Sequence, residues 1–480
     1  MKIIKNYLYN VFYQLFIIIA PLITMPYISR VLGPTGVGIN SYTNSIVQYF
    51  ILFGGLGVSL YGNRQVAYVR DDRQKLTNTF WEITFMRGFT MGGALIIFYL
   101  FLFLNHQYQQ AYLIQSLLIW AALFDISWFF QGMENFRVTV LRNTLVKLGT
   151  IILLFTCIKG PQDLIKYILI LALSQVLGNL TLWPYLRNYI DRPQWHKLQL
   201  WQHLGPSLAL FIPQIATQLY LILNKQILRF VIDVQASGFY DDSDKIVKML
   251  LAIVTATGTV MLPHVANSFA KGNKKSVQRF LYQMFDFVSC LAVPLMFGIA
   301  AISLKFAPWF FSKRFTAVGP LMMIESMVVL LIAWSNVIGV QYLLPMHRNR
   351  DYTVSVTLGA ILNIIISVPL ILWLGINGSM VATVLSELAV TLYQLWVVRH
   401  EVSFNQLFKN VGKYLIAGSL MFIIVFTMNM RLTFNWKLLL LEIMVGIVVY
   451  IVLLFVLRPT ILRLLAQFKQ RLLVTHDNKQ

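Results

Sequence analysis

Stretches of apolar residues recur along the whole chain, and short polar segments separate them. An α-helix needs about 20 predominantly apolar residues to cross the roughly 30 Å hydrocarbon core of a membrane. The pattern therefore predicts about fourteen membrane-spanning helices. They lie at residues 8–28, 39–61, 80–104, 112–130, 138–158, 164–186, 207–232, 246–269, 281–303, 318–343, 352–374, 380–398, 414–430 and 436–457. The connections are too short for a separate soluble domain, so we expect an all-α integral membrane protein.

A weak internal repeat relates the two halves of the chain. Gly38-Ile-Asn-Ser-Tyr42 resembles Gly238-Phe-Tyr-Asp-Asp242, at an offset of about 200 residues. Parallel repeats of six helices imply two pseudo-symmetric bundles with a cavity between them, the natural place for a substrate. The predicted domains are a bundle at 1–190, a second at 200–400, two further helices at 410–457 and a basic tail at 458–480. The tail carries Leu462, Leu465 and Phe468 on one face, which suits the inner membrane surface.

Composition supports the membrane assignment and sets the orientation. Hydrophobic residues make up 58% of the chain and charged residues only 12%, about half of the share in soluble domains. With the N-terminus inside, most Lys and Arg residues fall in cytoplasmic loops, so we expect both termini in the cytoplasm. The net charge of +21 then reflects these loops and anionic headgroups, and not nucleic-acid binding, since no basic domain lies outside the spans.

The N-terminal segment and the two cysteines do not alter the predicted membrane fold. Lys2 and Lys5 precede the first apolar run, which has no small-residue cleavage site, so this run is expected to stay as the first helix. Cys157 and Cys290 both fall inside predicted spans, and they form neither a disulfide framework nor a CxxC metal motif.

The seventh span carries the strongest polar signal at membrane depth. Gln214, Gln218, Lys225 and Arg229 are spaced 4, 7 and 4 residues apart, which places them on one helical stripe. Two cations four residues apart repel each other, so an anionic group is expected opposite them. That group is either an anionic substrate in the cavity, or a protein carboxylate or lipid phosphate; the sequence leaves both open.

The second span offers neutral polar groups. Asn40, Thr43, Asn44 and Gln48 fall on one face. Amides and hydroxyls of this kind suit sugar hydroxyls or water, and they suit helix–helix hydrogen bonding equally well.

Charged residues in the third and fourth spans have structural and functional interpretations. Glu82 and Arg87 favour an internal ion pair or an interfacial feature over a binding site. Asp125 is either a carrier of H⁺ or Na⁺ or the structural counter-ion of Lys147 or Arg87, and the structural role is favoured. The lone intramembrane carboxylates Asp286, Glu325, Glu387 and Glu442 are further candidates for ion coupling.

Signals for catalysis are weak. The acidic run Asp241-Asp-Ser-Asp244 could mimic a glycosyltransferase metal motif, but it lies at a predicted outer helix start, where carboxylates suit the helix dipole. The chain has no G-x-x-x-x-G-K-[ST] motif, and its seven His residues show no metal spacing. We therefore expect a protein that is not an enzyme and holds no metal or cofactor.

Three motifs, in order along the chain, resemble those of bacterial polysaccharide flippases of the Wzx type. They are Pro26-Tyr-Ile-Ser-Arg-Val-Leu-Gly33…Gly36-Val-Gly38, then Asp125-Ile-Ser-Trp128-Phe-Phe-Gln-Gly132-Met-Glu134, then Phe211-Ile-Pro213…Tyr220…Asn224-Lys225…Gly238-Phe-Tyr240…Lys245-Ile246. The resemblance covers essentially the whole chain. It places the protein in the superfamily of multidrug, oligosaccharidyl-lipid and polysaccharide exporters.

This resemblance implies a MATE-like, V-shaped pair of six-helix bundles in the bacterial cytoplasmic membrane, working by alternating access. The implied substrate is an undecaprenyl-pyrophosphate-linked oligosaccharide, moved from the inner to the outer leaflet for capsule or exopolysaccharide assembly, with a polysaccharide polymerase complex as a further partner. Lys225 and Arg229, with Arg30 as their rough counterpart in the first half, would meet the pyrophosphate. One departure is Asn224, where the family often has Asp, and it removes one candidate coupling carboxylate.

Two rival functions remain. A multidrug or organic-cation antiporter of the same fold would need carboxylates in the central cavity, but the first acidic residue of the chain is Asp71, after both of the first two spans. A membrane polymerase or glycosyltransferase would need a sizeable outer loop, and the loops are too short. The sugar composition of the substrate and the driving ion, H⁺ or Na⁺, stay open.

Overall fold

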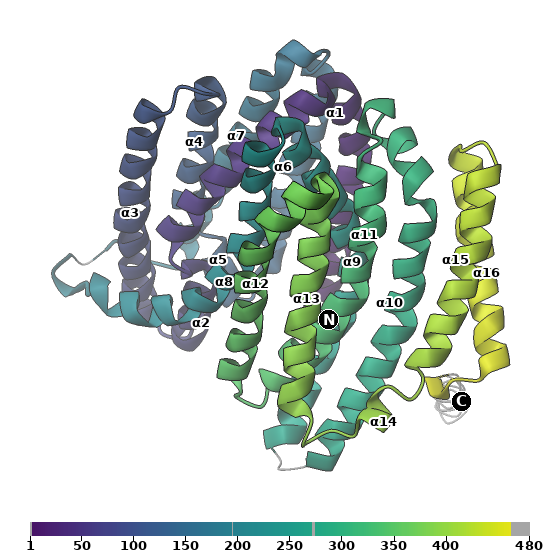
Figure 1. Cartoon of the computed structure of the whole chain (residues 1–480). Coiled ribbons are helices and arrows are strands. Elements are labelled where there is room, and N and C mark those ends of the chain that lie inside the picture. The colour runs from purple at the N-terminus through teal and green to yellow at the C-terminus, as the bar shows by residue number, and fades with distance from the viewer. Residues whose placement is uncertain (1, 194, 271–273, 462–480) are drawn as a thin grey trace, which may run out of the picture. The chain divides into compact units, whose positions relative to one another are not determined.

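The computed structural model describes residues 2–193, 195–270 and 274–461, and across them the chain forms helices joined by short turns (Figure 1). Eleven helical stretches of this part are long and apolar enough to cross a membrane, and the first of them, Ile18–Val69, contains the second predicted span and the second half of the first. Hydrocarbon offers no hydrogen bonds, so a chain this apolar must satisfy its backbone within each helix. The predicted all-α membrane fold is confirmed.

The chain divides into two compact units, one ending at Gly238 and the other beginning at Phe239. The main helices of the first unit are α1 (Lys2–Gly55), α2 (Val58–Val69), α3 (Arg73–Leu104), α4 (Gln109–Leu123), α5 (Ser127–Gly132), α6 (Phe136–Cys157), α7 (Leu164–Leu180) and α8 (Leu204–Val231). Four short 3₁₀ turns join them, η1 (Pro161–Asp163), η2 (Trp183–Asn188), η3 (Trp195–Lys197) and η4 (Leu200–His203). The unit also includes the first residues of α9 (Val234–Ala270).

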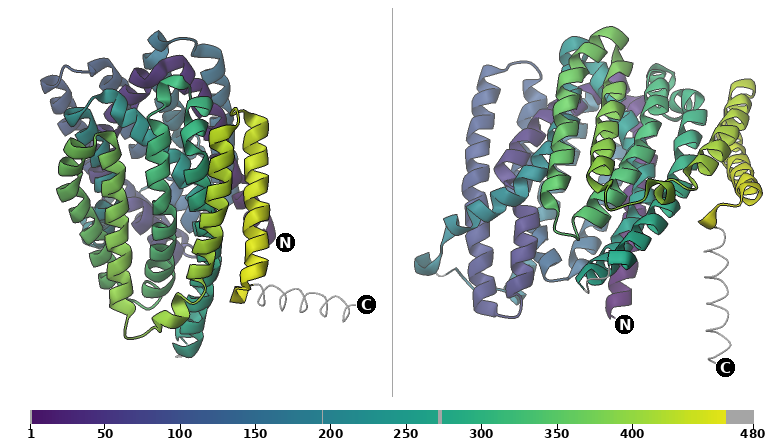
Figure 2. Two further views of the ribbon diagram at one scale, coloured as in Figure 1. Left: turned by 45° about the vertical axis from the view of Figure 1, so that its right-hand side comes forward. Right: turned by 60° about the horizontal axis from the view of Figure 1, so that its bottom comes forward.

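The second unit holds the rest of α9 and the helices that follow it. These are α10 (Lys274–Phe310), α11 (Val318–Ser335), α12 (Asn349–Leu374), α13 (Ile376–Val398), α14 (Phe404–Leu407), α15 (Val411–Arg431) and α16 (Trp436–Leu457), with a 3₁₀ turn η5 (Lys313–Phe315) and a π-helical segment η6 (Asn336–Leu343). Within this unit α10 packs against α11 and α15, and α15 and α16 lie side by side (Figure 2).

The first two predicted spans differ from the structure at their connection. They are joined in the single long helix α1, which bends at Gly33, where φ is +70°. The second span ends at Gly55 and not near Tyr61, because Gly57 takes a left-handed conformation with φ of +73° and starts α2. Glycine has no Cβ, so it adopts these positive φ values at little steric cost.

The predicted domain boundaries at 1–190, 200–400 and 410–457 remain a prediction. Contacts within the chain group α8 with the first unit, whereas the sequence analysis counts it with the second bundle. The predicted basic tail on the inner membrane surface runs over residues 458–480, of which 462–480 lie outside the described residues.

The repeat-related glycines Gly38 and Gly238 lie against each other where α1 crosses the first turn of α9. A Cβ on Gly38 would lie 2.1 Å from the carbonyl oxygen of Val234, and one on Gly238 would lie 2.8 Å from the amide nitrogen of Gly38. The hydroxyl of Ser41 donates to the carbonyl oxygen of Ser237 at 3.2 Å in the same crossing. Small residues let helix backbones approach this closely in membranes, so the crossing depends on both glycines.

An aromatic cluster holds α2, α3 and α5 together. Trp128, Phe129 and Phe130 of α5 are buried, and Phe80 of α3 stacks on Trp128 with ring centroids 5.6 Å apart. These three residues belong to the second motif of the sequence analysis. The aromatic part of that motif therefore serves packing, whereas Gln131 is exposed and lines the cavity described below.

We predict that Gly38→Ala destabilises the protein by about 1–3 kcal/mol, the usual effect of overpacking, because α1 and α9 would have to separate. The measurement is thermal unfolding in detergent. Gly92→Ala is the matched control, since Gly92 also lies within a helix and a Cβ there would meet nothing within 4 Å. A Gly38→Ala protein as stable as Gly92→Ala would contradict the close crossing.

Candidate functional site

The first unit contains a cavity of about 870 Å³ with a polar lining. Residues of α1, α3, α4, α5, α6 and α7 line it, so the helices that bound it are those of a membrane-spanning bundle. Cavities of this size hold ligands of a few rings. Because polar groups are expensive in hydrocarbon, a polar cavity inside such a bundle is a candidate functional site.

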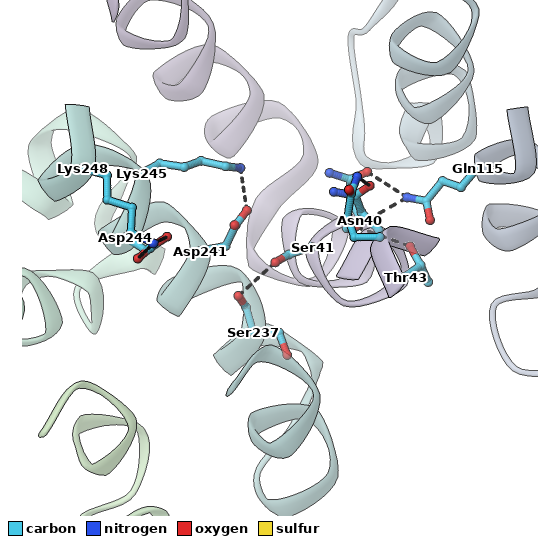
Figure 3. Close-up of polar contacts among 11 residues, drawn as sticks. Asn40, Ser41, Thr43, Gln115, Ser237, Asp241, Asp244, Lys245 and Lys248 are labelled. Atoms are coloured by element: carbon cyan, nitrogen blue, oxygen red, sulfur yellow. Dashed lines mark hydrogen bonds and ion pairs between the residues drawn. The ribbon is translucent and has the colours of Figure 1, made fainter. Parts of the chain in front are cut away.

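The α1 wall of the cavity carries the amides that the sequence analysis placed on one helical face. Asn40, Asn44 and Gln48 all line the cavity. The amide of Gln115 on α4 donates to Oδ1 of Asn40 at 3.2 Å (Figure 3), and Gln48 donates to Asn44 at 3.4 Å. Thr43, which shares that face in the sequence, is fully buried and donates to the carbonyl oxygen of Ile39. Three of the four predicted residues thus reach the cavity.

Further lining residues come from α6 and α7, and the sequence did not lead us to expect them there. Arg142, Asn143 and Lys147 face the cavity from α6, while Gln175 and Asn179 face it from α7. The guanidinium of Arg142 donates to Oδ1 of Asn179 at 3.1 Å, and Asn179 donates to the carbonyl oxygen of Ala121 at 2.6 Å. The spacing of Asn143, Lys147 and Thr150 along α6, three to four residues, could have revealed this stripe.

Arg87 and Asp125 meet at the cavity, but not as a simple ion pair. The guanidinium of Arg87, which is buried, donates to the backbone carbonyl oxygen of Asp125 at 2.7 Å. The carboxylate of Asp125 accepts from the backbone amide of Ser127 at 2.9 Å and so caps the turn into α5. Both residues line the cavity, and this arrangement gives Asp125 a structural role beside Arg87.

The expected pair between Glu82 and Arg87 does not form. Instead, the buried carboxylate of Glu82 bonds to Nε2 of His203 at 2.8 Å, to the side chain of Gln202 at 3.1 Å and to the backbone amide of Gln199 at 2.8 Å. The hydroxyl of Tyr61 completes the network through Nδ1 of His203 at 2.7 Å. Glu82 therefore fixes the start of α8 against α2 and α3, away from the cavity.

A second contact, outside the membrane-spanning segments, involves the chain segment that joins α7 to α8. The guanidinium of Arg73 makes two hydrogen bonds to Asp191, at 3.1 and 2.8 Å. These bonds hold the pKa of the Asp191 carboxyl below its usual value. Because both side chains are exposed, the pair contributes little to stability.

The predicted cationic stripe of α8 lies outside the cavity lining. Lys225 and Arg229 are half-buried and Gln218 is exposed, while the side chain of Gln214 lies outside the described residues. The guanidinium carbon of Arg229 lies 5.9 Å from the ring centroids of both Tyr42 and Tyr108, at the outer limit of cation–π contact. Arg30 on α1 is exposed.

The acidic segment near residue 241 lies inside α9 and not at a helix start as predicted, because the helix already begins at Val234. Within the second unit, Asp241 pairs with Lys245 and Asp244 with Lys248 (Figure 3). These i,i+4 pairs stabilise the helix. Each carboxylate thus has a basic partner one turn away.

Three of the lone intramembrane carboxylates accept hydrogen bonds within the second unit. Glu325 accepts from the hydroxyl of Ser243 at 2.6 Å. Asp286 accepts from Asn410 and Tyr414 at 3.0 and 2.8 Å. Glu442 accepts from Asn429. Such partners satisfy a buried carboxylate.

We predict that Glu82→Ala lowers the free energy of unfolding by about 3 kcal/mol, because the buried ring of His203 would lose its partner and the Gln202 side chain and the Gln199 amide would lose their acceptor. Thermal unfolding in detergent measures it. Asp191→Ala removes an exposed carboxylate from the segment that joins α7 to α8, and it should change the midpoint of thermal unfolding little. Equal losses in the two variants would argue against the buried network.

Comparison with known proteins agrees with this architecture. Residues 3–269 match the family described as "Polysaccharide biosynthesis protein". A relative from Escherichia coli (strain K12), named "Putative O-antigen transporter", is 24% identical over 401 residues, which cover 79% of this chain and 92% of the relative.

Two solved structures share the fold. The structure titled "Lipid II flippase MurJ, inward closed conformation" has a TM-score of 0.74 at 15% identity, covering 94% of this chain and 98% of that one. An inward-facing multidrug resistance MATE family transporter of the MOP superfamily has a TM-score of 0.63 at 12% identity, covering 82% and 94%. The family match spans more than half of this chain and confirms the resemblance to Wzx-type polysaccharide flippases. The chain therefore belongs to the polysaccharide biosynthesis protein family, as a multi-pass membrane protein with this transporter fold.

Proposed function

We propose that this protein is a flippase for a lipid-linked oligosaccharide and not an enzyme. In this proposal an undecaprenyl-pyrophosphate-linked repeat unit moves from the cytoplasmic to the outer leaflet by alternating access, for capsule or exopolysaccharide assembly. The names of the relatives, an O-antigen transporter and a lipid II flippase, support a substrate of this kind.

The single observation that carries the proposal is the polar cavity of the first unit. An oligosaccharide headgroup carries many hydroxyls, and each loses its hydrogen bonds to water when it enters hydrocarbon, at a cost of several kcal/mol. The amides of Asn40, Asn44, Gln115 and Gln175 offer replacement donors and acceptors at membrane depth. A cavity of about 870 Å³ can hold a few sugar rings while the isoprenoid tail stays in lipid.

The cations of α8 are proposed to hold the diphosphate. Ammonium and guanidinium groups bind phosphate oxygens by charge-assisted hydrogen bonds. Lys225 and Arg229 lie one turn apart on α8 and are half-buried, which would let them reach a headgroup beside the apolar tail. Arg30 is proposed to assist from α1.

Orientation, energy coupling and further partners complete the proposal. Both termini are placed in the cytoplasm on the distribution of Lys and Arg in the loops. Transport is proposed to be coupled to H⁺ or Na⁺. Asp125 is a weaker candidate for that coupling than for a structural role, because its carboxylate caps Ser127. A polysaccharide polymerase would receive the flipped unit.

The test is the leaflet distribution of lipid-linked repeat units in cells depleted of this protein, measured with a membrane-impermeant sugar-modifying probe. We expect complete units to accumulate on the cytoplasmic side, out of reach of the probe. An unchanged distribution in cells without a redundant flippase would overturn the proposal and favour a drug antiporter of the same fold.

We further predict that Lys225→Ala and Arg229→Ala each lower glycan export several-fold, because each removes a cation proposed to bind the diphosphate. Glycan output is compared at equal amounts of protein that elutes as a single species in detergent. Lys437→Ala is the control, since Lys437 is an exposed cation at the start of α16. Normal output from both α8 variants would remove them from the site.

A further inference from the structure

The lining of the first-unit cavity has an excess of positive charge. Among the residues that line it, Arg87, Arg142 and Lys147 are basic and Asp125 is acidic. The carboxylate of Asp125 is already bonded to the backbone amide of Ser127. The lining therefore supplies more cationic groups than its carboxylate can neutralise, within a membrane-spanning bundle.

Lys147 is the least compensated of these cations. It lies half-buried on α6, and it forms no ion pair in the part of the chain that the structure describes. An ammonium group held at membrane depth without a counter-ion is unfavourable. Water or an anionic ligand in the cavity must therefore complete its surroundings.

Neutral groups that suit sugars line the same cavity as this ammonium. Asn143 and Thr150 lie on the same stripe of α6, and Gln175 lines the cavity from the neighbouring helix α7. Arg142, five residues before Lys147, has its guanidinium oriented by Asn179 at 3.1 Å. Amides and a hydroxyl recognise ring hydroxyls, while a guanidinium and an ammonium recognise a carboxylate.

We infer that Arg142 and Lys147 form a subsite for an acidic sugar, so that the transported oligosaccharide carries a carboxylate in addition to its diphosphate. This inference rests on the proposed function and names its substrate class. A diphosphate could supply the same negative charge. The surrounding amides favour the sugar, since they match hydroxyls and a bare diphosphate offers none.

The experiment uses the purified full-length protein in nanodiscs and two synthetic probes. One is an undecaprenyl-pyrophosphate-linked trisaccharide containing glucuronic acid, and the other is the same lipid with that carboxyl reduced to give glucose. The free acidic trisaccharide serves as a third probe. Equilibrium binding is measured for the wild type and for Lys147→Gln, Lys147→Arg and Lys159→Gln. Lys159→Gln removes an exposed cation just after α6, outside the cavity lining.

We expect the wild type to bind the acidic lipid-linked probe about tenfold more tightly than the neutral one, the usual contribution of a charge-assisted hydrogen bond. Lys147→Gln should weaken binding of the acidic lipid-linked probe about tenfold, to the affinity of the neutral one, and so remove this preference. Lys147→Arg and Lys159→Gln should keep the preference.

Other outcomes separate the two proposals. Equal binding of both lipid-linked probes by the wild type would overturn the acidic-sugar subsite while leaving the flippase function standing. If Lys147→Gln weakens the binding of both lipid-linked probes equally, the ammonium contacts the diphosphate, and the acidic-sugar subsite is again overturned. If the free acidic trisaccharide binds in a Lys147-dependent way and neither lipid-linked probe binds, the subsite is supported and a lipid-linked substrate is not.

Discussion

The cost of a polar group in hydrocarbon constrains every part of the first unit. Arg87 is buried in a membrane-spanning bundle, and its guanidinium donates to the backbone carbonyl oxygen of Asp125 at 2.7 Å. Asn179 links Arg142 of α6 to the carbonyl oxygen of Ala121 on α4. Each bond crosses between helices, so the groups that make the cavity polar also hold its walls together. Without such partners the charged groups would destabilise the bundle by several kcal/mol.

The crossing of α1 and α9 shows how an internal repeat becomes a contact. Gly38 and Gly238 occupy equivalent places in the two halves of the sequence, and the structure packs them against each other. A pair of equivalent small residues at a crossing lets the two backbones approach equally from both sides. The repeat was visible in the sequence, but the contact was not, because self-similarity does not say which copies touch.

The fold was largely predictable from the sequence, and the site only in part. Hydropathy identifies the helices because each span must be continuously apolar, and periodicity placed Asn40, Asn44 and Gln48 on the face that lines the cavity. The partner of Glu82 could not be predicted in this way, because His203 lies 121 residues away and reaches it through tertiary packing. The α6 and α7 walls were missed for the same reason, since a cavity depends on how several helices face one another.

The charged residues of the cavity determine which class of ligand it favours. Lys147 has no carboxylate partner among the residues that the structure describes, and such a cation makes the bundle less favourable than a neutral lining would. An anionic ligand removes that penalty on binding, so part of the binding free energy comes from relief of the electrostatic cost in the free protein. By linkage, such a ligand also stabilises the bundle that holds it. A carboxylate fixed beside Lys147 would compete with an anionic ligand, whereas the carboxylate of Asp125 accepts from the backbone amide of Ser127 at the turn into α5. The same cations that destabilise the cavity electrostatically thus favour an anionic ligand over a neutral one.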